Sequence, residues 1–154
     1  MKRIISFVLI ITMLSVTLTA CGGAVSGDER DCKKLITDFE NALNDADADA
    51  ILNCINPDIS TPLKTALKAI NTGKEKVISI IFDFLDITVT SEEGEEVKDD
   101  VKNVEITPKE YNLEDTSGTV LCDMQIKAGK TTIDREITFK VIKKDDAWYI
   151  AGVK

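Results

Sequence analysis

The feature that most constrains this chain is a change of hydrophobic period near its middle. Before residue 86, apolar side chains recur at intervals of three and four residues, which is typical of helices that bury one face. From Val101 onward, apolar and polar side chains alternate, which is typical of strands with one buried face. Helices followed by consecutive strands predict an α+β domain, with the helices packed on one face of a strongly curved antiparallel sheet.

The helical half divides at turn-forming residues. We expect a first helix over about 29–43 with Asp28 as its N-cap, and a second over about 47–55. A third helical stretch starts near Thr61-Pro62, is interrupted at Gly73 and resumes to about Leu85, and the segment 87–90 is predicted to be a short strand. The apolar residues assigned to these helices are Cys32, Leu35, Ile36, Phe39, Ala42, Leu43, Ala50, Ile51, Cys54, Ile55, Leu63, Ala66, Leu67, Ile70, Val77, Ile78, Ile81, Phe82 and Leu85.

The second half predicts five strands joined by short turns, which pair antiparallel. The strands are expected over 101–107, 110–113, 119–127, 131–143 and 147–153. One face would consist of Val120, Cys122, Met124, Ile126, Ile133, Ile137, Phe139 and Val141, with Arg135 intruding on it. A curved sheet of this kind, packed against helices, encloses a cone-shaped space.

The first twenty residues predict an export signal. Lys2 and Arg3 precede the apolar run 4–14, and small residues lead to Cys21. This stretch is shorter than the roughly 20 apolar residues that a membrane-spanning helix needs. The segment Leu18-Thr19-Ala20-Cys21 resembles the bacterial lipobox, in which the Cys is acylated and becomes the new N-terminus.

The resemblance to a lipobox implies that the chain has three parts and that its folded domain is held at a membrane. Residues 1–20 would be a lipoprotein signal peptide, 21–27 a flexible tether and 28–154 a single α+β domain. The lipid on Cys21 would then hold the domain at the cell membrane, facing the extracytoplasmic side. An ordinary cleaved signal with a chance Cys is the alternative.

The charge of the chain argues against nucleic acid as a partner. Cleavage after residue 20 would remove Lys2 and Arg3 but no acid, which takes 19 basic and 27 acidic side chains to 17 and 27, a formal charge of −10. Phosphate backbones repel such a surface unless it carries a basic patch, and the sequence shows no basic cluster.

Two segments resemble nuclear-transport-factor-two-like domains. Residues 39–52 (FENALNDADADAIL) are similar to the helix, acidic hinge and helix that open such domains, and 137–150 (ITFKVIKKDDAWYI) to their last hairpin. The resemblance implies the cone-shaped fold found in many small bacterial lipoproteins. It does not imply an activity, because the superfamily includes isomerases, dehydratases, ligand binders and protein-binding modules.

No catalytic, cofactor or metal site is predicted. The chain has no histidine, the commonest general acid or base, and no enzyme motif of the superfamily matches it residue by residue. Asp45, Asp47 and Asp49 begin like a calcium loop but lack its Gly and final Glu, so we expect them to cap the second helix. The acidic run 92–100 is expected to be a solvated loop.

Cys32, Cys54 and Cys122 lie on predicted apolar faces, which favours buried thiols. Export also permits a disulfide. In a simple helical hairpin, Cys32 and Cys54 would be offset by roughly 8 Å, too far for a disulfide without a wider hinge. A bond between Cys54 and Cys122 would instead join helix to sheet. The pairing stays open at this stage.

Several polar and aromatic strand residues remain as site candidates. Trp148 and Tyr149 are neighbours on a strand, so one would be core and the other open to a partner. Asp123, Arg135 and Glu136 are candidates for an inward position, with structural pairing as the alternative.

The leading hypothesis for function is a lipid-anchored, non-catalytic module that binds a protein or a small apolar ligand. The alternatives are a small isomerase- or hydrolase-like enzyme that uses a buried carboxylate such as Asp123, and a structural component of the cell envelope. The sequence leaves the partner, the choice of inner or outer membrane, and the oligomeric state open.

Overall fold

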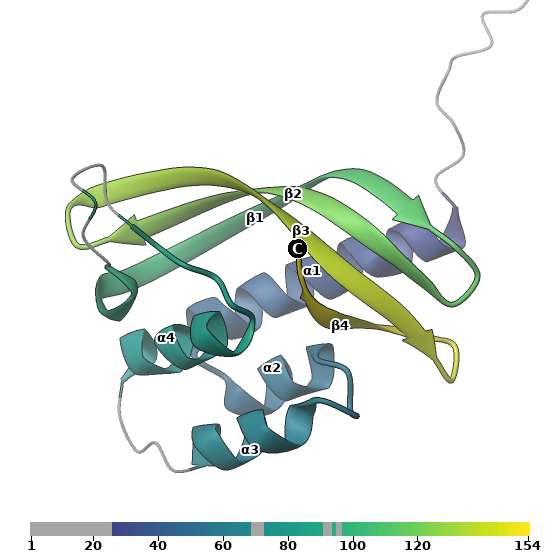
Figure 1. The fold of residues 1–154 in the computed structure, drawn as a ribbon, viewed down its shortest axis with the longest axis horizontal. Helices are drawn as coiled ribbons and strands as arrows, with labels where there is room; N and C mark the ends of the chain where they lie inside the picture. The colour runs from purple at the N-terminus through teal and green to yellow at the C-terminus, as the bar shows by residue number, and fades with distance from the viewer. Residues whose placement is uncertain (1–25, 69–72, 91–93, 95–96) are drawn as a thin grey trace, which may run out of the picture.

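The computed structural model describes residues 26–68, 73–90, 94 and 97–154. In this part of the chain, helices come first and strands follow (Figure 1). The elements are α1 (Gly27–Asp45), α2 (Ala48–Cys54), α3 (Ser60–Lys68), α4 (Lys74–Phe84), the short 3-10 helix η2 (Lys98–Asp100), β1 (Val101–Leu113), β2 (Ser117–Ala128), β3 (Thr131–Lys144) and β4 (Ala147–Val153). The predicted signal peptide, Cys21, Ile70 and the glutamates at 92, 93, 95 and 96 lie outside the described residues.

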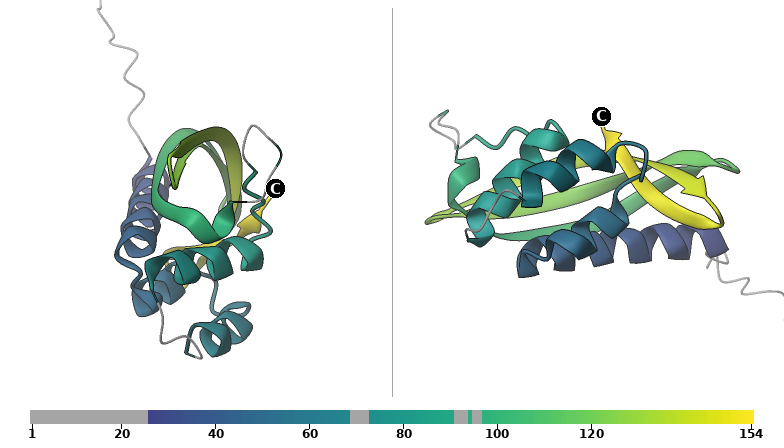
Figure 2. Two further views of the ribbon diagram at one scale, coloured as in Figure 1. Left: turned by 90° about the vertical axis from the view of Figure 1, so that its left-hand side faces the viewer. Right: turned by 90° about the horizontal axis from the view of Figure 1, so that it is seen from below.

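The strands form one antiparallel sheet in the order β1-β2-β3-β4. The β2–β3 register runs without a shift from Ser117↔Ile142 to Ala128↔Thr131. The sheet is strongly twisted, and the helices lie on one side of it (Figure 2). The predicted α+β class, with helices on a curved antiparallel sheet, is therefore confirmed.

Helix α1 begins earlier than predicted. Ser26 is its N-cap: the backbone there is extended and the Ser26 hydroxyl accepts a hydrogen bond from the Glu29 amide at 3.1 Å. The prediction that Asp28 caps this helix is wrong, because Asp28 is already inside the first turn. Its carboxylate bonds to the β3–β4 hairpin instead.

The expected acidic cap of the second helix is confirmed. The Asp47 side chain accepts a hydrogen bond from the Ala50 amide at 3.0 Å. Asp49 lies in the first turn of α2, where a negative charge complements the helix dipole.

The strand half differs from expectation in two places. The predicted strands 101–107 and 110–113 form a single strand, β1, because a register shift between Pro108 and Glu110 absorbs the proline. The predicted strand 87–90 does not form, since residues 87–89 are irregular and Thr90 is only an isolated bridge residue, although Ile87 and Val89 are buried as their alternation predicts. It packs its apolar side chains into the core without joining the sheet ladder.

Two side chains of α1 cover the outer edge of β1. Asn44 accepts from the Val104 amide at 3.0 Å and donates to the Val104 carbonyl at 2.6 Å, and Glu40 accepts from the Ile106 amide at 3.0 Å. Four residues of an α-helix span about 6 Å, and two residues of a strand span about 6.8 Å. Glu40 and Asn44, four residues apart on α1, therefore reach Ile106 and Val104, two residues apart on β1. The helix thus takes the place of a further strand.

Within the described residues, no helix combines the length and the apolar character needed to cross a membrane.

Candidate functional site

The cone between the helices and the sheet is packed with side chains. Phe39 of α1 and Phe139 of β3 meet edge to face, with ring centroids 6.0 Å apart. The inner residues of β2 are at most 4% exposed, and Phe82 of α4 is fully buried. The core residues with no exposed surface are Cys32, Ile36, Phe39, Leu43, Ile51, Ile55, Ile78, Ile81, Phe82, Val89, Val101, Val104, Val120, Cys122, Ile126, Phe139 and Ile150. The cone is therefore a core and offers no room for a ligand among these residues.

Asp123 is not a buried carboxylate, and the prediction of an inward catalytic role for it is wrong. Its side chain is 56% exposed on the outer face of β2, where Lys109 lies 3.2 Å away. Lys109 also pairs with Glu136 at 2.8 Å. Strand alternation explains this, because the neighbours Cys122 and Met124 point inward. Structural pairing, the alternative reading of Asp123 and Glu136, is confirmed.

Arg135 lies on the inner side of β3, beyond the packed core. Its guanidinium donates a hydrogen bond to the carbonyl oxygen of Thr88. It therefore connects the sheet to the segment that follows α4, and it does not enter the cone.

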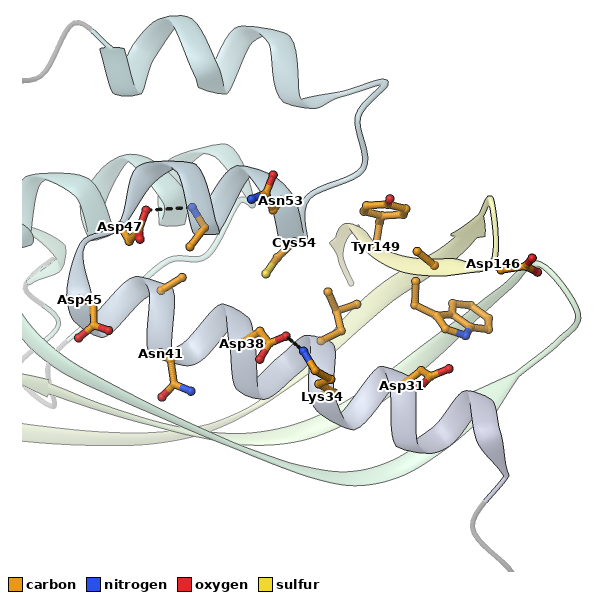
Figure 3. A pocket seen from close by; sticks show the side chains of 15 residues that line it. Asp31, Lys34, Asp38, Asn41, Asp45, Asp47, Asn53, Cys54, Asp146 and Tyr149 are labelled. Carbon is orange, nitrogen blue, oxygen red and sulfur yellow. Dashed lines mark hydrogen bonds and ion pairs between the residues drawn. The ribbon is translucent and has the colours of Figure 1, made fainter.

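A groove lies on the other side of α1, between this helix, α2 and the start of β4 (Figure 3). Its volume is about 680 Å³. We call it the acidic groove; its lining is Asp31, Lys34, Leu35, Asp38, Asn41, Ala42, Asp45, Asp47, Ala50, Asn53, Cys54, Asp146, Ala147, Trp148 and Tyr149.

The charge of the acidic groove is strongly unbalanced. Five aspartates line it, and Lys34 is the basic residue among the lining side chains. Lys34 forms an ion pair with Asp38 one helical turn away, and this hydrogen bond raises the pKa of Lys34. The other four carboxylates have no cationic partner within the groove lining, so a bound cation would find negative potential there.

The floor of the acidic groove is apolar. Leu35, Ala42 and Trp148 are buried beneath it, and the Cys54 side chain points from α2 toward α1 (Figure 3). Tyr149 is half-buried, and its ring points away from α1 (Figure 3). The predicted division of the two aromatics is thus confirmed: Trp148 belongs to the core and Tyr149 remains open.

One wall of this groove has a sequence signal, a polar stripe on α1. Asp31, Lys34, Asp38, Asn41 and Asp45 recur at intervals of three and four residues, a polar stripe beside the apolar stripe of the same helix. A polar stripe normally faces solvent, so it reveals a groove only once α2 and β4 are known to flank it.

A polar cluster closes one end of the molecule. The Asp28 carboxylate accepts hydrogen bonds from Lys143 Nζ at 2.7 Å and from Trp148 Nε1 at 3.0 Å. The hydrogen bond from Lys143, then that from Trp148, lowers the pKa of Asp28. Lys143 also lies 5.7 Å from the centre of the Trp148 ring, within cation–π range. These contacts tie the first turn of α1 to the β3–β4 hairpin.

The three cysteines of the described domain are free and buried. Burial, the main cause, raises the pKa of Cys32 and Cys122 to about 12 and that of Cys54 to about 11. Thiols with such pKa values stay protonated at neutral pH and react slowly. The expectation of buried thiols is confirmed, and neither disulfide considered from the sequence is present.

No group of three or more His, Cys, Asp or Glu side chains within residues 26–68, 73–90, 94 and 97–154 is arranged to hold a metal ion.

Comparison with known proteins supports the fold. No protein-family model matches the sequence, and neither does any curated protein. Among solved structures, an NTF-2 like protein of unknown function from Shewanella oneidensis MR-1 is similar, with a TM-score of 0.57 and 18% identity over 82% of this chain and 96% of that one. A designed NTF2 protein is also similar, with a TM-score of 0.54 and 12% identity over 82% of this chain and 97% of that one. The α+β body of this chain therefore has the nuclear-transport-factor-two-like fold.

Proposed function

We propose that this chain is a lipid-anchored, extracytoplasmic, non-catalytic module that binds a cationic segment of a partner protein in its acidic groove. The observation that carries the proposal is the groove's charge, five aspartates against one lysine, over an apolar floor. The lipid on Cys21 would concentrate the module at the membrane surface, while the acidic domain itself would be repelled by anionic lipid.

The packed cone favours this reading over a small apolar ligand. A ligand in the cone would have to displace side chains such as Phe39 and Phe139, which are fully buried and in contact. The acidic groove needs no such rearrangement, since it is already open between α1 and α2. Arginine or lysine side chains would meet carboxylates along α1.

The test is to measure the binding of an octa-arginine peptide by titration calorimetry. The variant Asp31→Asn/Asp45→Asn removes two groove carboxylates that take part in no ion pair with another described residue, and we expect binding about five-fold weaker. The matched control Asp49→Asn/Asp115→Asn loses the same charge from exposed positions outside the groove and should bind as the parent does. Equal weakening in both variants, or no binding by the parent chain, would contradict the proposal.

A further inference from the structure

The outer edge of β3 is only partly covered by β4. Pairing between these strands runs from Lys144↔Ala147 to Phe139↔Val153, and the last backbone contact is the Lys154 amide on the Thr138 carbonyl at 3.0 Å. The first half of β3, residues 131–137, has β2 on one side. Among the described residues, no backbone hydrogen bond reaches its other side.

The geometry identifies which backbone groups are open. The Thr138 carbonyl points to the β4 side, and the β2–β3 register has no shift. Backbone direction alternates along a strand, so the amides and carbonyls of Thr132, Asp134 and Glu136 point to the same side. These three residues present a short row of donors and acceptors that have no backbone partner among the described residues, and we call this row the open edge.

The other two sheet edges are protected at several positions. Asn44 and Glu40 bond the outward groups of β1 at Val104 and Ile106, and the next outward position is Pro108, which has no amide hydrogen. On β4, Ile150 forms a parallel bridge with Ile55, and its carbonyl accepts a hydrogen bond from the Asn56 amide at 2.8 Å. Free sheet edges invite pairing with another chain. Beyond these protected positions, residues 131–137 of β3 form a run of edge positions that no neighbouring strand pairs within the described residues.

Two hollows flank the open edge, one on each face of the sheet. The outer hollow, about 610 Å³, is lined by four carboxylates, those of Glu105, Asp123, Asp134 and Glu136, and by Arg135; Lys109 pairs with two of the carboxylates. The inner hollow, about 440 Å³, lies between β3 and the segment after α4, and is lined by Thr88, Thr90, Ile133, Arg135 and Glu136. Side chains of an added strand would alternate between an acidic hollow and a smaller, less charged one.

We infer that the open edge binds an extended segment of a partner polypeptide as a further strand. The partner's backbone would pair with Thr132, Asp134 and Glu136. Its outward side chains would be Lys or Arg, placed over the outer hollow, and its inward side chains would be small and apolar, placed beside Ile133. A second copy of this chain is a poorer occupant. If two copies paired by their open edges about a twofold axis at Asp134, the Asp134 carboxylates of the two copies would lie side by side and repel each other.

The test uses the full-length chain in mild detergent and an eight-residue peptide of alternating Lys and Val. Hydrogen exchange at the amides of Thr132, Asp134 and Glu136 should slow at least ten-fold when the peptide binds. A peptide of the same sequence with every amide N-methylated has no N–H donor on either edge and cannot pair as a strand, so it should not bind.

Variants separate backbone pairing from charge. Asp134→Pro removes one open amide at an edge position, where proline is tolerated, and should weaken binding at least ten-fold. Asp134→Lys/Glu136→Lys should reverse the preference, toward a peptide of alternating Glu and Val. The control Asp49→Lys/Asp115→Lys has the same charge change at exposed positions elsewhere and should keep the original preference.

Three results would overturn the inference. Binding that survives both N-methylation and Asp134→Pro would mean that no strand is added. Protection of 131–137 that grows with protein concentration, without peptide, would mean that copies of this chain pair there. Protection confined to 31–54 would place the peptide in the acidic groove, so the two proposals can fail independently.

Discussion

At the scale of single residues, the stability of this domain depends on a few side chains that pair with backbone. Asn44 satisfies both backbone groups of Val104, a strand position that β2 cannot reach. Val104 is buried, so water would not replace these hydrogen bonds if they were lost. Asparagine is usually a weak helix former, and its long-range role explains its presence in the last turn of α1.

We therefore expect Asn44→Ala to lower the free energy of unfolding by about 2–3 kcal/mol, since it leaves an amide and a carbonyl of Val104 without partners. Urea denaturation measures this. The control Asn41→Ala, at an exposed position one turn earlier, should change stability by less than about 0.5 kcal/mol. Equal effects would show that the contact with β1 contributes nothing.

The Asp28 cluster predicts a pH effect of known sign. The pKa of Asp28 is lowered in the folded chain by its hydrogen bond from Lys143, so the ionised form is stabilised by folding. That stabilisation is present above the unfolded pKa and is lost as the pH falls through the folded pKa.

The variant Asp28→Asn should therefore have a lower urea midpoint than the parent at about pH 7, and the difference should shrink at about pH 3. Lys143→Gln removes the cation that pairs with Asp28, so the urea midpoint of this variant should depend less on pH than that of the parent. Parallel midpoint curves for the parent and Asp28→Asn at every pH would show that the cluster has no energetic role.

At the scale of elements, helix ends decide where the chain turns. Helix α4 ends with Asp86 in the left-handed region at φ 58°, and the Ile87 amide bonds the Phe82 carbonyl at 2.7 Å. This arrangement is the usual one for a helix that ends at a glycine, and here an aspartate occupies the position. Non-glycine residues are strained in this conformation.

Asp86→Gly should accordingly raise the free energy of unfolding by about 0.5–1 kcal/mol, because Asp86 is exposed and its left-handed backbone suits glycine. The matched control Lys76→Gly places glycine at an exposed position inside α4 and should lower stability by about 1 kcal/mol. The same sign for both variants in urea denaturation would contradict the explanation.

At the scale of the whole molecule, the fold places the start of α1 at the end that carries the β3–β4 turn (Figure 1). The Asp28 contacts fix this end of the domain to the first described helical turn. If Cys21 is acylated, only a few residues separate the lipid from this end, and the acidic groove that begins at Asp31 would then start close to the membrane surface.

The anchor itself is tested by Cys21→Ser. Metabolic labelling with a radioactive fatty acid should mark the parent chain and leave this variant unlabelled, and the variant should move from the membrane fraction to the soluble fraction. The control variant Ala24→Ser keeps the Cys21 thiol and should be labelled to the same extent as the parent chain. A labelled Cys21→Ser chain would place any lipid elsewhere.

The fold class was predictable because it depends on local periodicity. Side chains that alternate or recur within a few residues predict strands β2 and β3, the cap at Asp47 and the buried apolar faces. The cap of α1 at Ser26 and the single strand β1 were missed, because capping and bulges depend on the backbone conformation of one or two residues.

What the sequence by itself determined is therefore the two halves of the domain and the side of each element that is buried. Tertiary structure alone decided that Asp123 faces outward to Lys109, that the cone is filled, and that a polar stripe of α1 becomes one wall of a groove. The open edge of β3 likewise depends on where β4 ends and on which elements cover β1. Local periodicity follows from the geometry of one helix or strand, whereas a groove or a free edge follows from how distant elements pack together.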